Sequence, residues 1–162
     1  MSGSDRSRTL VAGLAAGCAG TVVMTATTRL ERRALGVHHP VDYDDAPIIA
    51  DLVERWTPLS LSRSTAPVVN QLGRFSYGSA AGVLRGLLDR RVRHPAVVFF
   101  GVMWVGEAVA LRALGVAPAP WRWRPRWLAS SMGQHVVYAV ATDATWRALV
   151  GHRSGGGEEG AQ

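Results

Sequence analysis

The sequence predicts an all-α fold: an integral membrane bundle of about four transmembrane helices, with one short amphipathic helix at the membrane interface. Apolar residues are gathered into four long segments, although the mean hydropathy of the 162 residues is only +0.08. The ionisable residues inside these segments are sparse. Because the hydrocarbon core of a bilayer is roughly 30 Å thick, about 20 mostly apolar residues suffice for a helix to cross it.

The four predicted spans are residues 10–28, 66–88, 95–116 and 127–150. The first contains no charged residue, and arginines follow it from Arg29 onwards. A signal peptide is the alternative for this segment, although its length favours a retained helix. The third is interrupted by only two charged residues, one of them Glu107, and the fourth contains His135 and Asp143.

Residues 66–88 give the weakest of these four predictions. Arg74 and Arg85 lie within the segment, and a helix exposed to lipid on all sides does not tolerate such residues. The polar positions fall largely on one helical face, formed by Asn70, Arg74, Tyr77 and Arg85. We therefore expect the segment to cross the membrane only if this face is turned toward the other helices.

The spans and their connections form a single membrane domain over residues 10–151. Residues 1–9 are a polar N-terminal segment, and residues 152–162 are rich in glycine and glutamate, which predicts a disordered tail. Residues 46–56 place their large apolar side chains on one helical face. This pattern predicts a short amphipathic helix that lies in the membrane interface.

The charge distribution indicates lipid rather than nucleic-acid partners. All 18 basic residues are arginine, and with 12 acidic residues they give a net charge of +6. They flank the apolar segments and form no patch with interleaved aromatic residues, so no nucleic-acid partner is predicted. Membrane lipids are the expected partners, with anionic headgroups at Arg122, Arg124 and Arg126. Arginines occur on both sides of a four-span arrangement, so the positive-inside rule does not select an orientation.

Small residues indicate where the predicted helices approach one another. Glycines with GxxxG spacing occur in two spans, at Gly13 and Gly17 and again at Gly78, Gly82 and Gly86. Helices in lipid associate through close packing of such residues. Packing within the chain is the favoured interpretation, and a homo-oligomer formed through residues 66–88 is the alternative.

The spacing of the last two spans places two ionisable side chains at one depth. If a joint at about residues 117–125 separates these spans, Glu107 lies ten residues before it and His135 ten residues after its end. At a rise of 1.5 Å per residue, both lie about 15 Å from the joint. The turn before residue 95 places residues 74–77 within one turn of Glu107. The sequence therefore predicts a polar layer, with the candidates Arg74, Tyr77, Glu107, His135, Tyr138 and Asp143.

Charges at membrane depth are expected to face the bundle and to pair. The favoured interpretation is an ion pair between Arg74 and Glu107, with His135 hydrogen-bonded beside it, which holds the helices in register. Asp143 can instead pair with Arg147, four residues further along the same helix. A proton or ion relay is the alternative, because histidine titrates near neutral pH.

No motif of a known enzyme class is present. The sequence contains no GxSxG, phosphate-loop, HExxH or CxxC pattern, and therefore predicts no catalytic activity. His135 is the only histidine deep within a predicted span, whereas a haem between helices usually has further axial ligands. We expect neither a cofactor nor a metal ion.

Several short motifs are spread over residues 10–150. They are Met24-Thr25, Tyr77-Gly78-x-x-x-Gly82, Gly101-x-x-Trp104-x-x-Glu107 followed by Leu114-Gly115-Val116-x-Pro118, and His135-x-x-Tyr138. In these residues the sequence resembles the YagU-like family of small bacterial inner-membrane proteins. Arg74 and Ala139 depart from it, standing where a histidine and a glycine are expected. The resemblance implies a location in the bacterial inner (plasma) membrane and no established catalytic activity.

The sequence thus predicts a noncatalytic integral membrane protein whose polar layer is structural. A proton- or ion-handling transporter or channel subunit that uses Glu107 and His135 is the alternative. A soluble helical binding protein is a third class, and it would be recovered in the soluble fraction after a carbonate wash.

Overall fold

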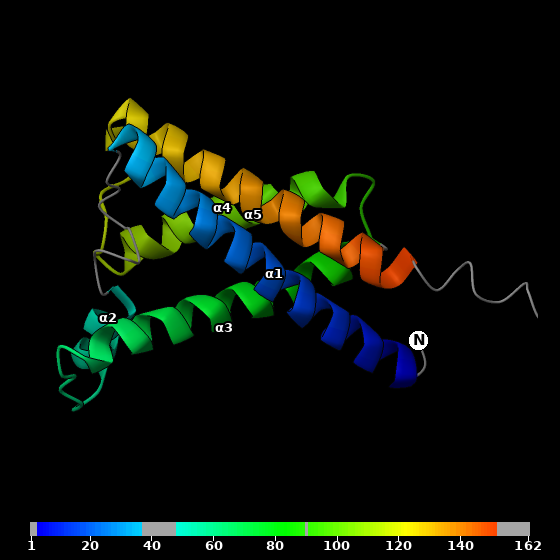
Figure 1. The fold of residues 1–162 in the computed structure, drawn as a ribbon, viewed down its shortest axis with the longest axis horizontal. Helices are drawn as coiled ribbons and strands as arrows, with labels where there is room; N and C mark the ends of the chain where they lie inside the picture. The colour runs from blue at the N-terminus through cyan, green and yellow to red at the C-terminus, as the bar shows by residue number, and fades with distance from the viewer. Residues whose placement is uncertain (1–2, 37–47, 90, 152–162) are drawn as a thin grey trace, which may run out of the picture.

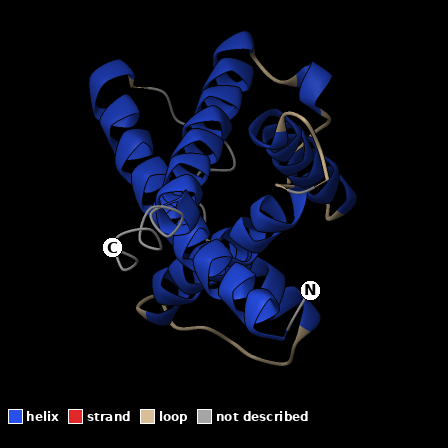
Figure 2. Ribbon diagram, turned by 90° about the vertical axis from the view of Figure 1, so that its right-hand side faces the viewer, coloured by secondary structure: helices blue, strands red, loops and turns tan. Residues whose placement is uncertain are grey.

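A computed structural model describes residues 3–36, 48–89 and 91–151 of the chain. These residues form helices and loops and contain no strand, which confirms the all-α prediction (Figure 2). The helices are α1 (Gly3–Leu35), α2 (Ile48–Trp56), α3 (Thr65–Leu88), α4 (Pro95–Ala113), the 3₁₀ turn η1 (Pro120–Arg122) and α5 (Pro125–Gly151).

The four long helices alternate in direction along the length of the molecule, and α1 packs against both α5 and α3, which it crosses at an angle (Figure 1). α4 packs mainly against α5, and α2 packs against the beginning of α3. The end of α1 and the beginning of α5 lie at one end of the molecule, near α2 (Figure 1). The beginning of α1 and the end of α5 lie at the opposite end.

The helix bounds follow the predicted segments, with shifts that have local causes. α1 extends beyond the apolar residues 10–28 at both ends, since the flanking arginine-rich segments continue the helix. α4 ends at Ala113, earlier than expected, because Gly115 has a φ of 70° and this left-handed conformation terminates helices. Residues 46–47 of the predicted interfacial helix and the tail after Gly151 lie outside the described residues.

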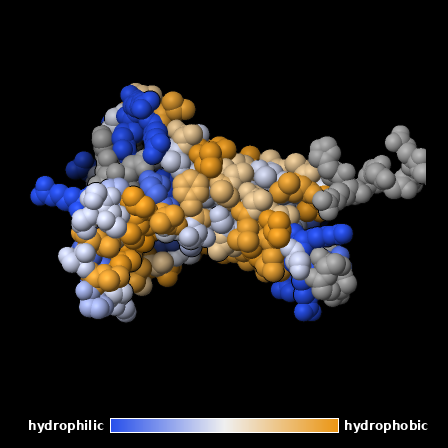
Figure 3. Space-filling view, turned by 60° about the horizontal axis from the view of Figure 1, so that its bottom comes forward, coloured by the Kyte–Doolittle hydropathy of each residue, from blue (hydrophilic) through white to orange (hydrophobic). Residues whose placement is uncertain are grey.

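Several polar side chains are buried, and many large apolar side chains are exposed. The buried face of α3 consists of small and polar residues, namely Asn70, Arg74, Gly78, Ala81, Gly82, Arg85 and Gly86. Large apolar side chains point outward from all four long helices, among them Leu14, Val22, Leu72, Val97, Val102, Val109 and Val140. Figure 3 shows hydrophobic residues gathered over the middle of one face, with hydrophilic residues toward both ends. Continuous apolar surfaces of this kind mark contact with lipid or another apolar partner.

Within the described residues, two helices are long and apolar enough to cross a membrane, namely the part of α1 from Asp5 to Leu35, and α4, from Pro95 to Ala113. A core helix of a soluble protein meets the same criterion but is mostly buried. Here only 33% of the most apolar 18-residue stretch of α1 and 22% of that of α4 are buried within the chain. α3 and α5 carry more polar residues, and these lie largely on their buried faces.

Glycines bring α1 and α3 into backbone contact. A Cβ added at Gly13 would lie 2.6 Å from the Cα of Val83, and one at Gly82 would lie 2.6 Å from the Cα of Gly17. A Cβ at Gly86 would meet the indole ring of Trp146 on α5 at 2.6 Å. The GxxxG glycines therefore pack within the chain.

The apolar side of α2 is covered by protein. Ile48 is buried in a cluster with Leu111, Ala117 and Trp123, at the end of the bundle where α4 ends and α5 begins. The backbone N–H of Ile49 donates to Oδ1 of Asn70 on α3, over 3.0 Å. The predicted interfacial helix is therefore docked on the bundle, and only its end, at Trp56, exposes a large aromatic side chain.

Candidate functional site

The centre of the candidate site is a hydrogen bond between α4 and α5. Nε2 of His135 lies 2.6 Å from Oε2 of Glu107, and Nδ1 of the same ring lies 2.8 Å from the carbonyl oxygen of Ser131. Both side chains are largely shielded, with His135 7% and Glu107 17% exposed. The contact places the two residues at the same depth, as the spacing along the α4–α5 hairpin predicts.

The hydrogen-bond partners of His135 determine where its protons lie. A carbonyl oxygen only accepts, so Nδ1 donates its N–H to Ser131. The Nε2–Glu107 bond then contains one proton, either as imidazolium beside carboxylate or as imidazole beside carboxylic acid. Both arrangements have zero net charge, which lowers the cost of burying the two groups in an apolar surrounding.

A small cavity of about 30 Å³ lies beside this pair. Its walls come from all four long helices: Thr21, Met24, Arg74, Tyr77, Gly78, Met103, Glu107, His135 and Tyr138. A cavity needs a volume of at least about 10–15 Å³ to hold a water molecule, so this one has room for one or two. The structure thus brings together five of the six candidates for the polar layer.

Further hydrogen bonds link the helices around the cavity. The hydroxyl of Tyr138 on α5 donates to the backbone oxygen of Gly78 on α3 over 2.6 Å. Nε1 of Trp104 on α4 donates to Oγ of Ser131 on α5 over 3.2 Å. α5 is therefore connected to both α3 and α4 through polar groups at this level.

Glu107 is bonded to His135, which the sequence placed beside it at the same depth. The Ser131 carbonyl orients the imidazole ring so that Nε2 faces α4. The ion pair between Arg74 and Glu107 stays a prediction. Arg74 is buried in the wall of the same cavity, and the side chain of Tyr77 is 48% exposed.

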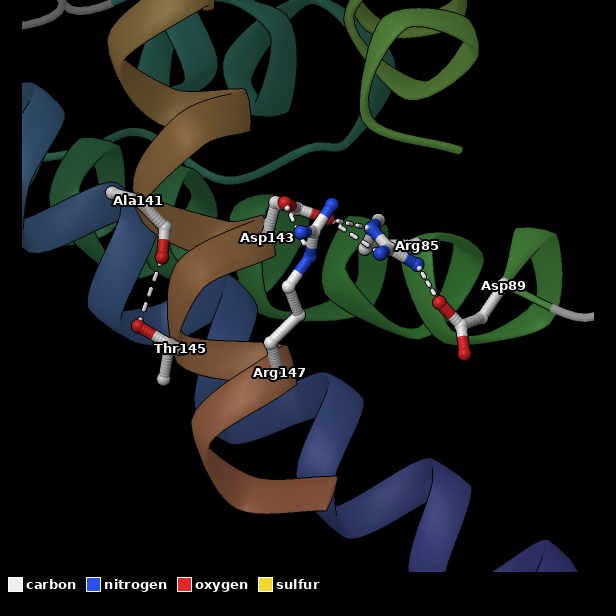
Figure 4. Close-up of polar contacts among 6 residues, drawn as sticks. All are labelled: Arg85, Asp89, Ala141, Asp143, Thr145 and Arg147. Carbon is white, nitrogen blue, oxygen red and sulfur yellow. Dashed lines mark hydrogen bonds and ion pairs between the residues drawn. The ribbon is translucent and has the colours of Figure 1, made fainter. Parts of the chain in front are cut away.

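Asp143, the sixth candidate, belongs to a separate polar cluster in the last third of α5 (Figure 4). Its Oδ1 accepts from Nε of Arg85 over 2.7 Å and also from Nη2 of that guanidinium. Oδ2 lies 3.0 Å from Nε of Arg147, the pair expected from the i, i+4 spacing. Nη1 of Arg85 donates to Asp89 over 2.9 Å.

Arg85 was not among the candidates, although it is fully buried. The sequence could have indicated this burial, because Arg85 lies on the polar face of the 66–88 segment. Its partner Asp143 lies on a helix that is not the next one along the chain, so the spacing within a hairpin could not connect them.

The hydrogen-bonded pair of Glu107 and His135 can hold and exchange a proton. Within the described residues, no three His, Cys, Asp or Glu side chains are grouped so that they could hold a metal ion. Comparison with protein-family models, curated proteins and solved structures finds no match to the chain. The described residues thus form a helical bundle that exposes many large apolar side chains and contains a buried polar layer.

Proposed function

We propose that the chain is a noncatalytic integral membrane protein in which buried polar bonds hold the transmembrane helices together. One observation carries this proposal: the buried polar contacts join different helices while the outer surfaces of these helices are apolar. Glu107–His135 joins α4 to α5, Tyr138 joins α5 to α3, and Arg85 also joins α3 to α5. Such bonds are a main source of helix association where lipid removes the hydrophobic driving force.

The span count that we propose is four, formed by α1, α3, α4 and α5. The shortest of them, α4, has 19 residues, which is about 28 Å at 1.5 Å per residue. The polar residues of α3 support its inclusion, because Asn70, Arg74 and Arg85 are buried inside the bundle. His135 is likewise buried on α5. α2 and the Trp121–Trp127 segment then lie at the headgroups on one side, with Trp121 84% exposed.

We further propose that the chain belongs with the YagU-like proteins of the bacterial inner membrane. The support is spatial: residues from separate motifs of the resemblance line one cavity, namely Met24, Tyr77, Gly78, Glu107, His135 and Tyr138. Arg74, which replaces an expected histidine, lines the same cavity. Motifs that are far apart in sequence thus converge on one site.

The second candidate function is a proton- or ion-handling subunit. The Glu107–His135 bond favours it, because this pair contains an exchangeable proton beside a cavity. The size of the cavity opposes it, since room for one or two waters does not make a continuous path. We therefore assign the layer a structural role.

Proton and cation flux into proteoliposomes tests this assignment. Wild type, Glu107→Gln and His135→Ala would be compared with Arg147→Gln, a control whose side chain is 68% exposed. A structural layer predicts that all four show only the leak of protein-free liposomes. It also predicts that Glu107→Gln and His135→Ala lower unfolding stability in detergent by about 0.6–2 kcal/mol. Flux in wild type and the control that is lost in the other two would establish the relay instead.

A further inference from the structure

A second and larger recess lies outside the polar layer, between the end of α1 and the beginning of α5. This α1–α5 groove has a volume of about 630 Å³ and is walled by residues 27–35 of α1 and 126–137 of α5. Its volume is within the range of about 300–1,000 Å³ that ligand sites occupy.

The groove extends over about one leaflet of a bilayer. Arg126 at its outer end and Val137 at its inner end are eleven residues apart on α5, which corresponds to about 16 Å along the helix. Half of a hydrocarbon core of roughly 30 Å is about 15 Å. Gly133 lies between them, and a Cβ added there would meet nothing within 4 Å. The missing side chain leaves this part of the groove open.

The lining contains one acid and one base. Arg126 contributes a guanidinium, and Glu31 of α1 contributes a carboxylate that accepts from Nε2 of Gln134 over 3.2 Å. The same Nε2 lies 3.1 Å from Oγ of Ser130, one turn closer to Arg126. A net anionic headgroup would be attracted to the first charge and repelled by the second. A headgroup with both a phosphate and an ammonium complements both charges.

From these features we infer that the α1–α5 groove is a binding site for one phospholipid with an aminoalkyl phosphate headgroup. Arg126 holds the phosphate, Glu31 accepts from the ammonium, and an acyl chain lies along the groove past Gly133. Arg is the side chain best suited to bidentate contact with phosphate. The inference rests on the proposed membrane location, because only a chain embedded in a leaflet presents the groove to lipid.

The test is native mass spectrometry of the full chain in detergent, titrated with dioleoyl phosphatidylethanolamine or dioleoyl phosphatidylglycerol. Gly133→Leu fills the groove, and Gly106→Leu is its matched control. Gly106 is also an exposed helical glycine where a Cβ would meet nothing within 4 Å, but it lies on α4 outside the groove. Far-UV circular dichroism checks that both variants keep the helical content of wild type.

Wild type and Gly106→Leu are expected to retain one phosphatidylethanolamine, and Gly133→Leu is expected to lose it. Glu31→Gln should lower the preference for phosphatidylethanolamine over phosphatidylglycerol about two- to fivefold, as expected for one exposed ion pair. Equal retention by Gly133→Leu and Gly106→Leu would overturn the site. Stronger retention of phosphatidylglycerol by wild type would overturn the headgroup assignment. A chain recovered in the soluble fraction after a carbonate wash would overturn the membrane location itself, which the lipid titration does not test.

Discussion

Replacing Gly82 with alanine should loosen the crossing between α1 and α3. The added Cβ would lie 2.5 Å from the nitrogen and 2.6 Å from the Cα of Gly17. Both are backbone atoms, so no side-chain rotation can relieve the contact. Carbon atoms reach their optimal separation at about 3.5–4.0 Å, and the two helices must therefore move apart by about 1 Å.

The expected loss of stability follows from this displacement. A radial gap of 0.5–1 Å already removes about a quarter to a half of the dispersion attraction between facing atoms. Overpacking of a close contact costs about 1–3 kcal/mol, and the better helix propensity of alanine returns up to about 1 kcal/mol. We expect Gly82→Ala to lower the free energy of unfolding by about 1–2 kcal/mol.

Reversible unfolding in mixed micelles, followed by circular dichroism, measures this change. Gly106→Ala is the matched control, because its Cβ meets nothing within 4 Å and only the propensity gain remains. We expect Gly106→Ala to be as stable as wild type or more stable. The account of the α1–α3 crossing is refuted if Gly82→Ala unfolds at the same denaturant fraction as Gly106→Ala.

Two further substitutions test the polar contacts with the same unfolding assay. Arg85→Ala leaves the carboxylate of Asp143 without its buried partner and should cost about 3 kcal/mol. Arg147→Ala removes an exposed ion pair and should cost at most about 1 kcal/mol. Equal losses in the two variants would contradict the buried role of Arg85. Tyr138→Phe removes a hydrogen bond to the backbone of α3 and should cost about 0.6–1.7 kcal/mol. An equal or larger loss in Tyr77→Phe, whose side chain is half exposed, would show that this bond is not what stabilises the bundle.

The sequence was most informative where short connections constrain the geometry. A short joint makes α4 and α5 antiparallel neighbours, so counting residues from the joint placed Glu107 level with His135. The structure places their polar atoms 2.6 Å apart. The same counting could not give the geometry of the bond between Glu107 and His135. That geometry depends on how the Ser131 carbonyl orients the imidazole ring, which residue spacing does not encode.

Counting residues along the sequence could not predict contacts between helices that are not consecutive. Arg85 and Asp143 lie on α3 and α5, with α4 between them in sequence, so no joint measures their relative depth. The pattern of glycines showed which faces pack closely but not whether their partner is the same chain. The amphipathic pattern of α2 is likewise the same whether its apolar face contacts lipid or packs on protein. In this structure Ile48 packs in one cluster with Trp123.

Protection of single cysteines from a membrane-impermeant maleimide tests the four-span bundle most directly. The chain has one native cysteine, Cys18, which is exposed on the middle of α1. In a cysteine-free background, Ala80→Cys, Val102→Cys and Val140→Cys place one thiol on the exposed side of α3, α4 and α5. Trp121→Cys, in the exposed η1 turn, is the accessible control.

In intact membranes, a four-span bundle predicts that all four mid-helix thiols, native Cys18 and the three introduced cysteines, remain unlabelled. The control reacts once the reagent has access to both sides. All four should react after denaturation. Labelling of any one mid-helix thiol as fast as the control would remove that helix from the membrane. Rapid labelling of all four would contradict the central claim and identify the chain as a bundle in water.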